Sequence, residues 1–422
     1  TVSSVINNIT EKNTNEESKL SLKVMADFSE KNPEKLETLS QNNSDQVEKL
    51  TISAVEEAQS SQEDADLIAK VVAVASDELA NKVVEEVSKN STDEKQTLSA
   101  QVLKAIVDSD SGKIDIINDE VKDTMIKQTI VSAQNQQEGT GVQQDQDMTS
   151  IVSDIIVNTN TETGSKIIEE LNNSSTNTEN DLSLKVISAI SEKDTTKLNT
   201  LSENNKEQIE TLTETAIKNA DASKESADLI AKVVANASDE LVNKVVEEVS
   251  KNSTDENQAL SAKVMKSIVE TNPEKIETLS DENKETIISQ TIEAAKNQAE
   301  GTSTDEIDLS NTIAEIITKS DTATAAKVLE TLEEVSNESD SKLSLSVVSN
   351  LTKQENYEEK MEILSVTSSV VEQSITKLVE KAVENASSEE DLEMVTNIVE
   401  NSKGTIADKV INSANKNEES KK

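Results

Sequence analysis

The sequence predicts an all-α protein, built as an elongated, solenoid-like array of short helical hairpins with extra helices. Two observations lead to this fold class. A long stretch of sequence recurs almost unchanged 162 residues later, and the apolar residues follow the 3.6-residue period of a helix. A third observation supports it: one Phe, one Tyr and no Trp leave Val, Ile, Leu, Ala and a few Met to build the interior. Such interiors suit arrays in which each unit packs on its neighbours.

The long repeat is clearest in residues 65–94, which recur as residues 227–256 with only two differences. The offset is 227 − 65 = 162 residues. On this period we divide the chain into a first repeat block, 1–138, which is incomplete at its N-terminus, and a second block, 139–300. A third block, 301–422, is divergent and incomplete and carries a C-terminal tail. We expect the chain to be a piece of a longer array, or to begin with a variant unit.

A shorter unit lies inside the long repeat. Each copy has an apolar helix, a turn, and a second helix that opens with Lys followed by an aliphatic residue, so about ten hairpins are expected. The longer gaps between these marker lysines have room for one extra helix, as at residues 47–58 and 121–133. The markers are Lys35, Lys82, Lys113, Lys166, Lys197, Lys244, Lys275, Lys327, Lys360 and Lys409.

The apolar spacing within each unit is helical. Apolar side chains recur at relative positions 0, 1, 4, 5 and 8, one face of a helix, as in Leu67, Ile68, Val71, Val72 and Ala75. Alternation with period two is not sustained, which argues against a sheet. Because β-branched residues weaken helix propensity and helices of ~10 residues are unstable alone, stacking on neighbours has to supply the order.

Several helix starts are marked by capping residues. Asn32 and Asn272 each precede a Pro at the first helical position, where Pro is favoured. Ser91 and Ser253 each have Glu three residues later, the spacing of a capping box.

Charge and composition exclude several classes of partner. The chain has 83 acidic and 41 basic residues, a net charge of −42, and no Arg. Such a field repels nucleic-acid phosphates, and the aromatic and Arg groups that stack on bases are scarce or absent, so no nucleic-acid partner is expected. Insertion of this segment into a membrane is not expected either, since no apolar run approaches the ~18 residues needed to cross one. High charge suits extracellular or cell-surface conditions where salt screens repulsion, with a cytoplasmic location as the alternative.

The chemistry of the chain argues against an enzyme, a cofactor or a metal site. Without His or Cys, acid–base catalysis near neutral pH would require buried carboxylates or lysines, and a pair such as Glu85 and Glu86 is interpreted as a solvated helix face. No catalytic, cofactor-binding or metal-binding residue is assigned. The best metal candidate, residues 108–115, has the alternating oxygen ligands of a calcium loop in Asp108, Asp110 and Asp115, but we interpret it as a polar turn.

Two functions remain open. The leading hypothesis is a non-catalytic structural or spacer segment of a long, acidic, repetitive surface or filament protein, secreted and bacterial, because a spacer requires only length and uniformity. The alternative is a helical-repeat scaffold that binds a basic protein or peptide, attracted by the net charge of −42. Neighbouring repeats or copies of itself are the other expected partners, and self-association into a filament fits either hypothesis.

Overall fold

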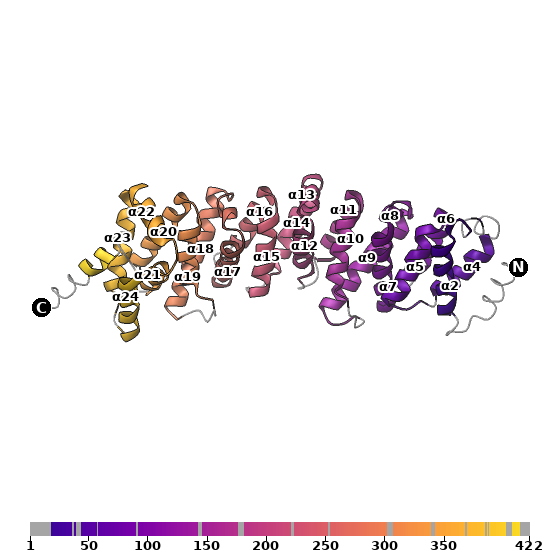
Figure 1. The fold of residues 1–422 in the computed structure, drawn as a ribbon, viewed down its shortest axis with the longest axis horizontal. Helices are drawn as coiled ribbons and strands as arrows, with labels where there is room; N and C mark the ends of the chain where they lie inside the picture. Colours follow the sequence, from indigo (N-terminus) through magenta and orange to yellow (C-terminus); the bar gives the residue numbers. More distant parts are fainter. Residues whose placement is uncertain are drawn as a thin grey trace. The chain divides into compact units, whose positions relative to one another are not determined.

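The computed structural model describes residues 18–35, 38, 44–56, 58–89, 92–141, 146–175, 181–220, 223–251, 254–301, 307–338, 342–367, 369–384, 386, 388–401 and 407–413. These residues are all-helical and include no strand, which confirms the predicted fold class of an α-helical repeat array. The chain divides into two compact units, Thr1–Asn219 and Ala220–Lys422, and each is described by itself. Figure 1 gives the helix labels.

The described part of the first unit holds five consecutive hairpins. They pair α2 (Ser18–Lys31) with α4 (Ser44–Glu56), α5 (Gln62–Val74) with α6 (Asp77–Ser88), α7 (Asp93–Asp110) with α9 (Asp119–Gln137), α10 (Met148–Asn158) with α11 (Thr161–Ser175), and α12 (Leu182–Lys193) with α14 (Lys206–Lys218). A short extra helix lies inside the third and the fifth hairpin: α8 (Lys113–Ile116) and α13 (Thr195–Asn204).

The described part of the second unit continues the same pattern. Its hairpins pair α15 (Lys224–Asn236) with α16 (Asp239–Ser250), α17 (Asp255–Thr271) with α18 (Asp281–Ala299), α19 (Leu309–Lys319) with α20 (Thr322–Glu338), and α21 (Leu343–Leu351) with α23 (Ser369–Glu384). The short extra elements are the 3-10 helix η1 (Pro273–Ile276) and α22 (Tyr357–Thr367). A last hairpin consists of α24 (Glu389–Asn401) and the helical residues 407–413.

Within each unit the hairpins stack in sequence order, so that first helices pack on first helices and second helices on second helices (Figure 1). In the first unit α5 packs between α2 and α7, and α6 packs between α4 and α9. The core between the two rows is made of fully buried Ile, Leu, Val and Met side chains, such as Ile68, Leu98 and Met125. Each hairpin therefore buries its apolar faces against its neighbours, as the array interpretation requires. No helix of the described residues is long and apolar enough to cross a membrane.

The helix ends follow local capping chemistry that recurs with the long repeat. Ser76 and Ser238 are N-caps of α6 and α16, and their hydroxyls accept a hydrogen bond from the backbone N–H of the third helical residue. The N-cap of α7 is Thr92, whose hydroxyl accepts from the Lys95 N–H, whereas Ser91 and Ser253, where capping boxes were predicted, lie outside the described residues. Gly139 and Gly301 follow α9 and α18 with φ of 67° and 72°, a left-handed conformation that favours Gly.

The structure corrects the assignment of the extra helices. Residues 121–133, expected to form an extra helix, belong to α9, the main second helix of its hairpin, and residues 47–58 likewise fall largely in α4. The extra helices are the short elements that carry the marker lysine, such as Lys113 at the start of α8. Short extra helices and long second helices share the same sequence pattern, because in both the marker lysine is followed by a buried apolar residue.

Seven of the ten marker lysines fall into two classes by the partner that they reach in the preceding hairpin. On the short extra helices, Lys donates to a backbone carbonyl at the C-terminal end of the preceding first helix, where helix carbonyls lack intrahelical partners. On three long second helices, Lys pairs with an acidic side chain of the preceding second helix. By contrast, Lys244 pairs with Glu248 of its own helix α16, and Lys409 donates to the Thr376 hydroxyl. The carbonyl pairs are Lys113–Ala75, Lys197–Thr159, Lys275–Ala237 and Lys360–Ser320, and the ion pairs are Lys82–Glu48, Lys166–Asp119, Lys166–Asp123 and Lys327–Glu285.

Replacing Lys197 with Met should lower the free energy of unfolding by about 1.5 kcal/mol, because the aliphatic stem stays while the Thr159 carbonyl loses its donor. Burial lowers the pKa of Lys197 below its ordinary value, opposed by the charge of Asp194. The unfolded chain therefore keeps this proton to higher pH than the folded chain, and Lys197 makes stability rise with pH just below 10.5. Urea denaturation at pH 7 and at higher pH should show both effects. The exposed Lys224→Met is the control, and equal losses in both variants would contradict the role of Lys197.

Candidate functional site

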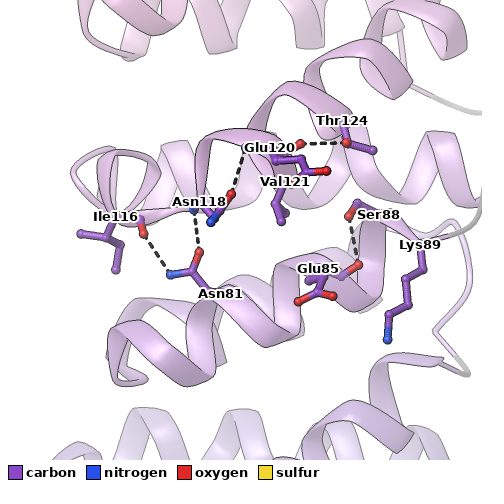
Figure 2. Close-up of a pocket in the computed structure, with 9 residues that line it drawn as sticks. All are labelled: Asn81, Glu85, Ser88, Lys89, Ile116, Asn118, Glu120, Val121 and Thr124. Carbon is purple, nitrogen blue, oxygen red and sulfur yellow. Dashed lines mark hydrogen bonds between the residues drawn. The ribbon is translucent and has the colours of Figure 1, made fainter.

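An open groove lies between α6 and α9, the second helices of two consecutive hairpins (Figure 2). It has a volume of about 610 Å³. One wall is α6, and the other is the end of α8 with the first turns of α9. The lining residues are Asn81, Glu85, Ser88, Lys89, Ile116, Asn118, Glu120, Val121 and Thr124.

Asn81 ties the two walls together with its side-chain amide. Its Nδ2 donates to the Ile116 carbonyl at 2.9 Å, and its Oδ1 accepts from the Asn118 N–H at 2.6 Å (Figure 2). The same pair of bonds recurs in the second unit, where Asn243 reaches the Thr278 carbonyl at 3.1 Å and the Ser280 N–H at 2.6 Å. The side-chain amide therefore bridges two hairpins as a backbone peptide group would, and both of its polar atoms already have partners within the protein.

Other polar groups of the groove are also satisfied within the protein. The Asn118 side chain caps α9 by accepting from the Glu120 N–H at 3.0 Å. The hydroxyl of Thr124 donates to the Glu120 carbonyl at 2.8 Å, and that of Ser88 donates to the carbonyl of Glu85 at 2.9 Å. A hydrogen-bonded ion pair between Lys89 and Glu86 raises the pKa of the lysine.

The groups that remain available to a ligand are acidic and aliphatic. The side chains of Glu85 and Glu120 are exposed, one on each wall, and those of Ile116 and Val121 are half-buried beside them (Figure 2). Two carboxylates beside an aliphatic surface can bind a Lys or Arg side chain, with the charge at the carboxylates and the stem on the aliphatic groups. Exposure leaves these carboxylates in water, where they are poorly suited to acid–base catalysis.

A pair of buried side-chain hydrogen bonds lies next to the groove, and the sequence alone did not lead us to expect it. Gln128 accepts from the Ser99 hydroxyl at 2.5 Å and donates to the Ser88 carbonyl at 2.8 Å, which joins α9 to α7 and to the end of α6. Gln290 makes the same two bonds, to Ser261 and to the Ser250 carbonyl, at the same two distances. The sequence signal was a Gln kept at the same repeat position, as Gln128 and Gln290, among the buried residues of a second helix.

The candidate calcium segment forms the end of α7, a turn and the short helix α8. Its three carboxylates have protein donors: Lys104 for Asp108 at 2.6 Å, the Gly112 N–H for Asp110 at 3.1 Å, and Asn160 for Asp115 at 2.5 Å. Over the described ranges, no group of three or more acidic residues is placed to hold a metal ion. The interpretation of Glu85 and Glu86 as a solvated face holds for Glu85, which is exposed in the groove, but is wrong for Glu86, whose side chain is only 8% exposed and pairs with Lys89.

No protein-family model and no curated protein matches the sequence. Among solved structures, the chain is similar to an engineered protein at 14% identity, covering 94% of this chain and 99% of that one, with a TM-score of 0.33. It is also similar to a circular tandem repeat protein with novel repeat topology, at 18% identity, covering 94% and 90%, with a TM-score of 0.33. These likenesses assign no function, and the fold is established by the helices and packing described above.

Proposed function

We propose that the chain is a non-catalytic structural or spacer segment of a long, acidic, repetitive surface or filament protein. The observation that carries this proposal is that residues kept across the 162-residue repeat hold hairpins to one another. Asn81 and Asn243 make matching bonds, and so do Gln128 and Gln290. Repetition of structural ties, rather than of a reactive site, is what a spacer requires.

The net charge supports the same role. A net charge of −42 keeps the chain soluble and opposes nonspecific association, and salt outside a cell shortens that repulsion. We therefore place the protein at a bacterial cell surface or in the extracellular space, with the cytoplasm as the alternative.

Small-angle X-ray scattering of the full chain tests the spacer role. A compact globule of this length would have a radius of gyration of about 22 Å. The proposal predicts a clearly larger value and a distance distribution with a long tail. A radius near that of the compact globule would end the spacer proposal.

A scaffold for a basic partner is the second candidate, and the groove between α6 and α9 favours it. Six of its nine lining positions are identical 162 residues later. The three that differ all lie on the wall formed by α8 and α9, where Ile116, Asn118 and Val121 are replaced by Thr278, Ser280 and Asn283. A binding array is expected to vary at groove positions that solvent reaches while its core stays constant.

Binding of a fluorescent oligolysine peptide tests this second function. Replacing Glu85 and Glu120 together with Gln should weaken binding about tenfold at low salt, since two charge-assisted contacts are lost. Replacing Glu94 and Glu138 together with Gln is the matched control, because both are exposed, lie outside the groove and carry the same two charges. An equal loss in the control would show that the peptide follows net charge rather than the groove.

A further inference from the structure

The groove between α6 and α9 has a counterpart in the second unit, at the same repeat positions between α16 and α18. The carboxylates of the groove walls recur there and are exposed in both places. The matching residues are Asn81 and Asn243, Glu85 and Glu247, and Glu120 and Glu282. The acidic groups that attract a basic partner are therefore present twice, and a difference in binding between the two places depends on the surrounding residues.

The aliphatic surface of the groove is replaced by polar residues in the counterpart. Figure 2 shows the half-buried Val121 side chain pointing from α9 toward α6. Asn283 takes its place, and its Nδ2 donates to the Asn243 carbonyl at 2.9 Å and to Asn243 Oδ1 at 3.2 Å. Ile116 is likewise replaced by Thr278. In the second unit an additional side-chain amide therefore joins the walls where the first unit presents an aliphatic side chain.

The marker lysine on the first wall also differs between the two places. Lys82 pairs with Glu48 of α4, in the preceding hairpin, at 2.6 Å. Lys244 pairs within its own helix and lies 3.7 Å from Glu247. Among the described residues Glu85 has no ion pair, whereas its counterpart Glu247 already has a lysine beside it. A basic ligand therefore meets an unpaired carboxylate on this wall only in the first unit.

A bound basic side chain depends on both kinds of group. Its charge lies at the carboxylates, and its long stem covers apolar surface that would otherwise face water. Val121 and Ile116 offer that surface in the first unit. In the counterpart the stem would meet the Asn283 amide, and displacing a hydrogen bond of that amide to Asn243 costs about 1 kcal/mol.

We propose that the groove between α6 and α9, and not its counterpart between α16 and α18, binds a basic side chain of an extended peptide, and that Val121 determines this difference. The inference rests on the scaffold role proposed above and deepens it, because it names the position that binds and the residue that keeps it open. The repeat keeps the ties between hairpins in both units, and the change of one aliphatic residue to Asn closes the second place.

Replacing Val121 with Asn tests the proposal without changing the net charge. Binding of a fluorescent oligolysine peptide to the full chain, at about 0.15 M salt to screen diffuse attraction, should weaken about tenfold. Asn283 shows that the fold accepts this residue at the same repeat position. Val74→Asn is the matched control, because Val74 is half-buried on α5 outside the groove and its own counterpart is Asn236. The control should bind like the parent chain.

The reverse change should open the counterpart. A chain with Lys244→Met, Thr278→Ile and Asn283→Val carries apolar residues where the first unit has Ile116 and Val121, and no longer has a lysine beside Glu247. Isothermal titration should show one more oligolysine bound per chain than in the parent. Lys244→Met alone is the control for the change in charge, and an equal number bound by both variants would overturn the role given to Asn283.

The failure of this inference can be told apart from the failure of the scaffold role. If the chain with Glu85→Gln and Glu120→Gln binds no more weakly than its charge-matched control, the scaffold role and this inference fall together. If that chain binds more weakly but Val121→Asn binds like the parent, the groove remains a binding site and only the role of Val121 is overturned. Circular dichroism of each variant verifies that the helices are intact.

Discussion

Replacing Ile106 with Ala should lower the free energy of unfolding of the first unit by about 2–5 kcal/mol, the usual loss when a buried Ile is truncated. Ile106 is 1% exposed on α7, which packs on α5, α9 and α10. The cavity would therefore lie on a helix that packs against helices of its own and both neighbouring hairpins. Urea denaturation followed at 222 nm measures the change.

The long repeat supplies a matched replicate for this prediction. Ile268 occupies the same repeat position on α17, is also 1% exposed, and should show a similar loss in the second unit when it is replaced with Ala. The exposed Lys127→Ala should change stability by less than about 0.5 kcal/mol. Losses below about 1 kcal/mol for both isoleucines would mean that packing between hairpins contributes little to the order of the chain.

Replacing Gln128 with Ala should lower the free energy of unfolding by about 2–3 kcal/mol, because it leaves the buried Ser99 hydroxyl and the Ser88 carbonyl without this partner. Gln290→Ala is the matched replicate in the second unit. The double variant Gln128→Met, Ser99→Ala should lose less than the sum of its two single changes, since both partners then become apolar. Strict additivity would show that the two side chains do not interact.

Much of the fold could be predicted from sequence because its determinants are local or periodic. The apolar spacing from Leu67 to Ala75 identifies a helix, and the 162-residue offset identifies an array. The roles of the marker lysines could not be predicted, because they depend on partners in another hairpin. Lys197 reaches the Thr159 carbonyl 38 residues before it, whereas Lys166 pairs with Asp119, 47 residues before it. Neither of these sequence separations can be inferred from the apolar spacing of a single helix.

The groove and the polar turn show the same limit. Asn81 looks like an ordinary helix residue in the sequence, yet its amide donates to the Ile116 carbonyl of the next hairpin and so joins the two walls of the groove. Conversely, Asp108 and Asp110 alternate as calcium ligands would, but their partners are Lys104 and the Gly112 N–H. Side-chain spacing along the chain fixes neither the direction of a carboxylate nor its partner.

The central claim is that these short aliphatic helices gain their order by packing on the next hairpin. Far-ultraviolet circular dichroism tests it most directly by comparing the full chain with an isolated peptide of residues 223–251, the hairpin of α15 and α16. The claim predicts strong helical minima for the full chain and a spectrum close to that of a random coil for the peptide. An isolated hairpin as helical as the full chain, or a full chain without helical minima, would contradict it.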